Sequence, residues 1–202
     1  MTDSEYVGSS DVQQMLEDRP YHIAPSLHLG VSLRSFRSEK LADFVKALLD
    51  EDITAARALY AALHPTYPIV MTRDFARAKA WVRGKVRGTE RAGMLASSKA
   101  KRLRSVGVWV NVQRDPVAWF LNEPVNADAS CFLEVPATEF EVQGLEIDYG
   151  LLAWDADLRY CDGGFDYFDC RGARWMHVNK EDGKKYLKNA YRVLLTRARQ
   201  GL

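Results

Sequence analysis

The chain of 202 residues carries 28 lysine and arginine residues against 27 acidic ones, a formal net charge of +1. This length accommodates one α/β domain with a full core. The near-neutral balance excludes a protein that holds nucleic acid by overall positive charge alone, so any such contact is expected to be local. The three cysteines form no CxxC pair and leave one over, which predicts free thiols and a cytoplasmic location.

No membrane partner is expected. The longest apolar runs fall well short of the roughly 18 residues that a membrane span needs, and the first ten residues are polar and acidic, unlike a signal peptide. Residues 1–24 are polar and weakly patterned, and we expect residues 25–202 to form a single domain.

The first expected elements of this domain are a strand and two helices. Alternation in LHLGVSL, at 27–33, predicts the strand. Ser38 is a typical N-cap, and apolar residues follow it at helical spacing. These residues are Leu41, Phe44, Val45, Leu48 and Leu49. A second, alanine-rich helix is predicted over 53–63.

The strand-then-helix theme continues through the middle of the chain. YPIVMT at 67–72 predicts a strand, and Asp74 opens a helix through Ala80 and Val82. A further strand is predicted at 93–96, followed by a basic helix over 99–104.

In the last third, strands are predicted at 131–135 and 149–154, and a hairpin at 167–178. A final helix begins near Asp182 and is expected to run almost to the end of the chain. Short apolar strands that alternate with helices favour a mainly parallel sheet with helices on both faces, which is an α/β fold.

Three segments carry candidate chemistry. LRSFRS at 33–38 places Arg37 after a predicted strand, where ligands of α/β sheets bind and a guanidinium can reach phosphate. TEFEVQGLE at 138–146 brings an amide, a turn glycine and a carboxylate together, in a form suited to a ribose hydroxyl. Taken alone, each segment fits an ordinary solvated loop better than a binding site.

The third segment is NAYRVLLTRARQGL at 189–202. Treated as a continuous helix, it places Arg197 at the flank of the apolar stripe and Arg199 on the opposite face. A guanidinium at a domain edge can stabilise charge on a phosphoryl group in transfer. The alternative is a basic helix terminus favoured by the helix dipole.

Together these segments resemble motifs four, five and six of superfamily 1 helicases, in the same order. The sixth is the most specific, since a hydrophobic helix there ends in Thr-Arg-Ala-Arg. Within that superfamily the chain resembles a bacterial group of helicases related to the helicase part of Schlafen proteins. This resemblance covers 25–202 and is carried by segments 32–36, 72–104, 134–160 and 189–201.

The resemblance implies a RecA-like fold of the P-loop NTPase type, and specifically the second, C-terminal motor domain. It implies that Arg37 and Arg197 contact the γ-phosphate, with Arg197 as arginine finger. It further implies that Gly144 and Glu146 lie near the ribose. The implied role of Gln143, where many relatives have Lys, is to couple the nucleotide state to the strand.

Thr138 would touch the backbone of single-stranded or duplex nucleic acid. Phe140 stands where some members have His, which puts one contact to the strand in doubt.

The sequence lacks the other half of such a motor. No G-x-x-x-x-G-K-[ST] occurs, and no Asp-Glu pair follows a hydrophobic strand. ATP and Mg²⁺ are therefore expected only with a complementary N-terminal motor domain or partner chain, and the domain alone is expected to be inactive. Relatives continue past the sixth motif into an apolar strand, so we expect a truncated domain with an open sheet edge and self-association.

Other types of site are less well supported. Cys161, Cys170 and His177 do not match zinc-ligand spacing. Asp155, Asp157 and Asp162 are interpreted as partners of the nearby Arg159 and Arg174 or as solvent-facing, in preference to a metal site. The five tryptophans are interpreted as core residues. The alternative function is an inert remnant that binds nucleic acid or protein.

Overall fold

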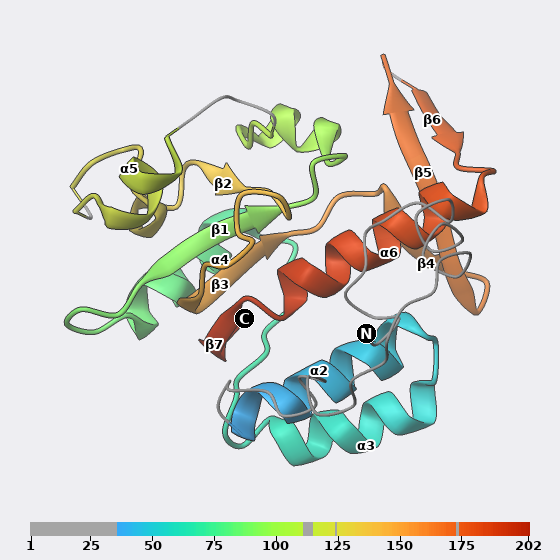
Figure 1. The fold of residues 1–202 in the computed structure, drawn as a ribbon, viewed down its shortest axis with the longest axis horizontal. Coiled ribbons are helices and arrows are strands. Elements are labelled where there is room, and N and C mark those ends of the chain that lie inside the picture. Colours follow the sequence, from blue (N-terminus) through green and yellow to red (C-terminus); the bar gives the residue numbers. More distant parts are fainter. Residues whose placement is uncertain (1–35, 111–114, 124, 173) are drawn as a thin grey trace, which may run out of the picture.

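The computed structural model describes residues 36–110, 115–123, 125–172 and 174–202 (Figure 1). Within them, a four-stranded parallel sheet is flanked by helices, and a separate three-stranded antiparallel sheet lies to one side. The α/β class with a RecA-like parallel sheet is thereby confirmed. The polar segment 1–24 and the strand predicted at 27–33 lie outside the described residues.

The parallel sheet has the order β2-β1-β3-β7. Its strands are β1 (Ala92–Ala96), β2 (Pro136–Ala137), β3 (Ile147–Ala153) and β7 (Ala198–Gly201). The strands predicted at 93–96 and 149–154 are confirmed as β1 and β3. The strand predicted at 131–135 is wrong: η3 (Ser130–Phe132) is a 3₁₀ turn, and Leu133 has a φ of 60°, which ends any extended run before β2 begins.

Strand β7 corrects the expected end of the chain. Helix α6 (Glu181–Leu195) begins as predicted but ends at Leu195, where the Thr196 hydroxyl bonds back to the carbonyls of Arg192 and Val193. The residues that follow form a strand parallel to β3, with Ala198 opposite Ile147. The slot expected to be empty is therefore filled.

The outer side of β7 is also covered. The Val70 amide donates to the Leu202 carbonyl at 2.9 Å, and the Leu202 amide donates to the Pro68 carbonyl at 3.0 Å. The buried Tyr67 hydroxyl donates to the Ala198 carbonyl at 3.1 Å. The strand predicted at 67–72 is not formed as such, but part of it pairs with the last residue. The open sheet edge expected from the sequence is wrong in this structure.

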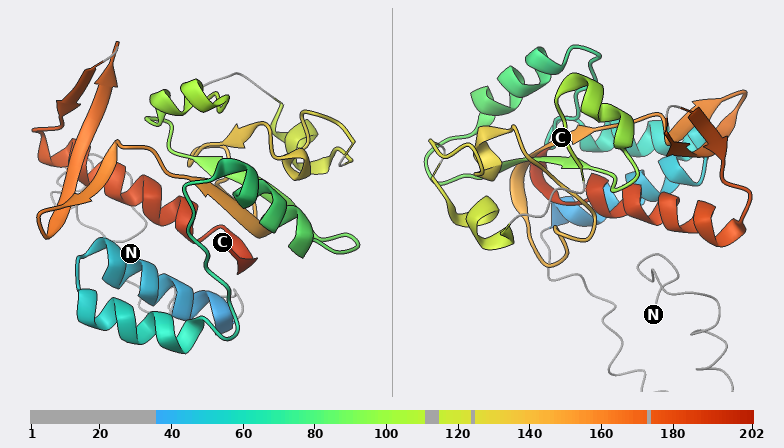
Figure 2. Two further views of the ribbon diagram at one scale, coloured as in Figure 1. Left: turned by 180° about the vertical axis from the view of Figure 1, so that it is seen from behind. Right: turned by 90° about the horizontal axis from the view of Figure 1, so that it is seen from above.

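Helices cover both faces of the parallel sheet (Figure 2). On one face lie α2 (Phe36–Leu49), α3 (Ile53–Leu63) and α6. The predicted stripe of α2 is buried on this face, where Leu41, Val45 and Leu49 belong to a first core cluster. On the other face, α4 (Phe75–Lys85), capped by Asp74 as predicted, contributes Val82 to a second core cluster.

Two further elements flank this sheet. Helix α5 (Pro116–Leu121) inserts the buried Trp119 into the first cluster. The basic segment predicted as a helix is a 3₁₀ helix, η2 (Lys101–Val106). Leu103 of η2 packs against the second cluster.

The antiparallel sheet follows the carboxyl end of β3. Its strands are β4 (Leu158–Cys161), β5 (Gly164–Arg171) and β6 (Arg174–His177), in the order β4-β5-β6. The hairpin predicted at 167–178 is confirmed, with Phe168 opposite His177. In Figure 1 this sheet stands beside the amino end of α6.

A substitution at Gly201 tests how closely β7 packs against its neighbours. A Cβ at this position would lie 3.1 Å from the Pro68 carbonyl oxygen and 3.1 Å from the Tyr149 ring. Because the backbone cannot yield cheaply, we expect Gly201→Ala to lower the free energy of unfolding by about 1–3 kcal/mol. Urea unfolding measures it.

Gly84→Ala in helix α4 is the matched control. No atom lies within 4 Å of its missing Cβ, so this change should raise stability by about 0.5–1 kcal/mol. Equal effects of the two substitutions would contradict the described seat of β7.

Candidate functional site

The parallel strands give the sheet two chemically different edges. Since all four strands run the same way, the residues that precede β3 and β7 share one edge, and those that follow β1, β2 and β3 share the other. The sequence-predicted site residues divide between these edges: the segment at 143–146 and Arg197 lie at the amino edge, and Thr138 lies at the carboxyl edge.

At the amino edge, two distant segments of the chain meet. The Ile147 amide donates to the Arg197 carbonyl at 3.2 Å, so Glu146 and Arg197 lie on neighbouring backbones. Just before them, Gly144 has a φ of 80° in an exposed turn, with no atom within 4 Å of its missing Cβ. Gln143 is exposed beside it. Four of the six predicted site residues are thus brought together.

Arg197 occupies the turn between α6 and β7. Its amide donates to the Leu194 carbonyl at 3.4 Å, and its Nε donates to the Val193 carbonyl at 3.3 Å. The half-buried side chain is therefore held along the last turn of the helix. The helical position assigned to this residue from the sequence is wrong, because α6 has already ended.

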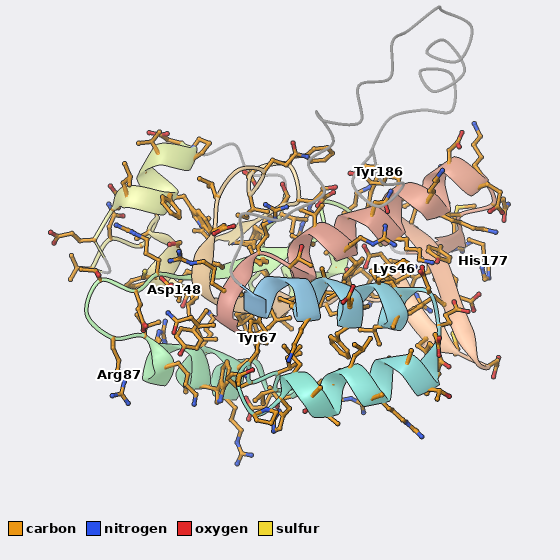
Figure 3. All side chains as sticks on the ribbon, turned by 60° about the horizontal axis from the view of Figure 1, so that its bottom comes forward. Lys46, Tyr67, Arg87, Asp148, His177 and Tyr186 are labelled. Atoms are coloured by element: carbon orange, nitrogen blue, oxygen red, sulfur yellow. The ribbon has the colours of Figure 1, made fainter. Side chains whose placement is uncertain are left out.

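Arg199 lies in β7 and is engaged within the domain. Its Nη2 lies 2.8 Å from the carboxylate of Asp148, a residue labelled in Figure 3. The same carboxylate also accepts from Gln200 and from the Arg91 amide. Burial alone would raise the pKa of Asp148, but these donors outweigh it and hold that pKa below its ordinary value. The two arginines differ because Arg199 has an acidic partner on β3, not because of opposite helix faces.

Arg37 belongs to the first turn of α2, and its side chain lies outside the described part of the structure. The amino end of α2 lies near β7 in both Figure 1 and Figure 2. This places the first turn of α2, to which Arg37 belongs, on the same side of the domain as β7.

Thr138, at the carboxyl edge, is only 5% exposed. Its amide and hydroxyl both donate to Glu141 Oε2, at 2.7 and 2.9 Å, and its carbonyl accepts from the amides of Glu141 and Val142. Every polar group of Thr138 is thus used within its own turn. The adjacent Phe140 is 55% exposed.

A buried polar cluster next to Thr138 was missed by sequence reasoning. Glu139 is 4% exposed and accepts from the Ser98 amide at 2.9 Å, the Ser98 hydroxyl at 2.6 Å and the Tyr186 hydroxyl at 2.7 Å. These bonds join the ends of β1 and β2 to α6. Burial, together with Glu139, raises the pKa of Tyr186. No local sequence pattern predicts this cluster, because Ser98, Glu139 and Tyr186 are far apart in sequence.

The two acids after β3 are also buried, which corrects their interpretation as surface partners of arginines. Asp155 accepts from the amides of Arg102 and Ala156. Asp157 is 0% exposed and accepts from the Leu158 amide and the Tyr191 hydroxyl, while its Oδ2 has no hydrogen-bond partner. Burial raises the pKa of Asp157 to about 6.

Among the described residues, no group of three or more His, Cys, Asp or Glu side chains is placed to hold a metal ion. The same part of the chain contains no helix long and apolar enough to cross a membrane. The three cysteines are free thiols.

Of the tryptophans, Trp119 is a core residue, as expected. Trp109 is 52% exposed and Trp154 is 36% exposed, so the assignment of these two to the core is wrong.

A family model described as Schlafen group 3, DNA/RNA helicase domain, matches residues 1–202. The chain belongs to this family. No curated protein and no solved structure matches it. A helicase-related, nucleic-acid-binding role follows for this Schlafen group 3 domain, and the match agrees with the resemblance carried by the motif segments.

Asp157 gives a pH-dependent prediction. Burial raises its folded pKa to about 6, above the ordinary value of 3.8, so between these values the folded state holds a proton that the unfolded state has lost. Stability should therefore rise as pH falls from 7.5 to 5, by up to about 1.4 kcal/mol per pH unit. Urea unfolding of the wild type and of Asp157→Asn, which cannot ionise, isolates this contribution. A stability difference between the two proteins that is the same at both pH values would refute it.

Proposed function

We propose that this Schlafen group 3 helicase domain is the C-terminal RecA-like half of a superfamily 1 motor. Arg197 acts as the arginine finger on a nucleotide held by a complementary motor domain. The observation that carries the proposal is the Ile147–Arg197 backbone hydrogen bond, which sets the fifth- and sixth-motif segments side by side at one sheet edge.

Arg197 suits this role by its chemistry and its position. A guanidinium stays protonated at any working pH and presents several donors in a fixed plane. Arginine fingers stabilise the charge that spreads over a phosphoryl group in transfer. Arg199, two residues on, is a poor candidate because its guanidinium lies 2.8 Å from the Asp148 carboxylate.

The neighbouring turn fits the sugar end of a nucleotide. Gly144 adopts a left-handed φ of 80° and leaves open space where a side chain would stand, beside the exposed Gln143. We propose that Glu146 accepts a hydrogen bond from a ribose hydroxyl and that Gln143 couples this edge to the strand site. Arg37, in the first turn of α2, is proposed as the second contact to the γ-phosphate.

The phosphate-binding loop and the Mg²⁺ ligands are proposed to come from the complementary domain, since the sequence has no G-x-x-x-x-G-K-[ST]. A bound Mg²⁺ nucleotide supplies the phosphoryl group, and the residues of this domain orient it and stabilise its charge.

We propose a structural role for Thr138, in place of the contact to the nucleic-acid backbone that the resemblance implies. All its polar groups are engaged within the turn, so we assign it to holding the segment that leads to Gln143. Contact with the nucleic acid is left to exposed neighbours at the same edge.

Arg197→Ala should lower kcat for ATP hydrolysis about 10³-fold when a complementary motor domain is supplied, in a longer polypeptide or as a partner chain, because the finger acts on the transition state. Nucleotide affinity should change little. Steady-state kinetics with and without single-stranded DNA measures both.

Arg199→Ala is the matched control. It removes the same charge two residues away, and its cost should fall on stability through the loss of the bond to Asp148. Equal loss of kcat in the two variants would show that the roles are not divided in this way.

The domain by itself should show no ATP hydrolysis, because positioning of the β- and γ-phosphates and the metal is absent. Phosphate release from the purified protein, with and without single-stranded DNA, tests this. Turnover that persists through repeated purification and is stimulated by nucleic acid would overturn the division of labour between two domains.

A further inference from the structure

The carboxyl edge of the sheet carries a basic and aromatic surface outside the three candidate segments at 33–38, 138–146 and 189–202. We define the η2–hairpin surface as η2 with its flanking residues 99–109, together with the β5–β6 hairpin. Its basic residues are Lys99, Lys101, Arg102, Arg104, Arg171 and Arg174. The sequence has no acidic residue from Arg91 to Val110 or from Cys170 to Lys180, although the whole chain carries a net charge of only +1.

Specific contacts join the two parts of this surface. Lys101 Nζ lies 3.5 Å from Asp169 on β5, and the Arg102 guanidinium lies 5.8 Å from the centre of the Trp175 ring on β6. The Arg102 amide donates to the buried Asp155 at the end of β3. Two segments far apart in sequence are thereby held together, and both follow the carboxyl ends of sheet strands.

The positive charge of the surface is only partly compensated. Of the two acidic residues on the β5–β6 hairpin, Asp169 pairs with Lys101 and Arg171 and Asp166 lies opposite Arg159 of β4. Asp155 is buried beneath η2. Arg159 of β4 adds a positive charge beside the hairpin, since its guanidinium lies 4.0 Å from the centre of the Phe168 ring and 4.8 Å from the centre of the Trp175 ring. Its buried Nη2 has no hydrogen-bond partner. Polyanions are the partners that such a local excess attracts.

An aromatic ring is exposed within this charge. Trp109 is 52% exposed, and the Arg104 guanidinium lies 4.9 Å from its ring centre. Grooves for single-stranded nucleic acid combine backbone-tracking cations with aromatic rings on which bases stack, at about 1–3 kcal/mol per base. Bases in an intact duplex are stacked on one another, so an exposed indole favours a single strand.

We infer that the η2–hairpin surface binds single-stranded nucleic acid, with Trp109 stacking on a base and with Arg102 and Arg104 contacting the phosphates. This inference rests on the proposed function and extends it, because the nucleic acid lies at the carboxyl edge and the nucleotide at the amino edge. DNA and RNA share the chemistry involved, so both belong in the test.

The experiment measures binding of fluorescein-labelled oligo(dT), oligo(U) and a duplex by fluorescence anisotropy over a range of salt concentrations. Trp109→Ala should weaken single-strand binding about tenfold, and Trp109→Phe, which keeps an aromatic face, should restore most of it. Arg102→Ala with Arg104→Ala should reduce the slope of log K against log salt by about 1.4, as two lost phosphate contacts require.

Arg57→Ala is the control for the loss of a positive charge outside this surface, since Arg57 is exposed on α3, which lies across the molecule from η2 (Figure 1). Thermal melts of each variant check folding. Single-strand binding that is unaffected by changes at Trp109, Arg102 and Arg104 would overturn this inference and leave the proposed function standing. Preference for duplex would overturn the single-strand assignment, and no binding to any of the three probes would overturn the nucleic-acid role as a whole.

Discussion

The hydrogen bond from the Ile147 amide to the Arg197 carbonyl ties the start of β3 to the start of β7. Because the two strands are parallel, the turn that enters β3 and the turn that leaves α6 are forced to the same edge of the sheet. The amino-edge arrangement depends on this constraint. If β7 lay elsewhere, Arg197 would have no fixed relation to Gly144 or Glu146.

Several contacts hold β7 beside β3. Small residues let it approach closely: a Cβ at Gly150 of β3 would lie 3.2 Å from Ala198 Cβ. On the outer side, Leu202 makes backbone bonds to Pro68 and Val70, and the Tyr67 hydroxyl donates to the Ala198 carbonyl. These bonds occupy part of the backbone edge that would otherwise favour aggregation. Asp148 then takes up Arg199 and Gln200.

The opposite edge is built on buried polar groups. Glu139 and Asp155 use their carboxylates mainly to bind backbone amides and hydroxyls from neighbouring elements. Burial of polar groups is tolerable only when they are hydrogen-bonded, and here the bonds lock η2, β2 and α6 to the strand ends. The basic side chains of η2 are thus presented on a rigid support, as a binding surface requires.

Sequence patterns predicted the elements with strong periodicity. The stripe of α2, the apolar strands β1 and β3, the Asp74 cap of α4 and the β5–β6 hairpin were all found where expected. Strand β2 has only two residues, too few for any period to show.

Strand β7 has the polar sequence ARQG, which does not resemble a buried strand. Its arginine and glutamine are accommodated because they bind Asp148 and Glu90, and this tertiary effect leaves no local pattern. The meeting of Arg197 with the turn at Gly144 was implied by motif resemblance, whereas the Ser98–Glu139–Tyr186 cluster depends on long-range packing that no local pattern contains.

The central claim is that Arg197 reaches a nucleotide held by another domain and acts only as the phosphoryl group is transferred. The most direct test measures affinity between this domain and a complementary motor domain loaded with ADP alone or with ADP and aluminium fluoride, a mimic of the transferring phosphoryl group. The account predicts tighter association with the mimic, a gain that Arg197→Ala abolishes and Arg199→Ala retains. An equal gain in the Arg197→Ala variant would contradict it.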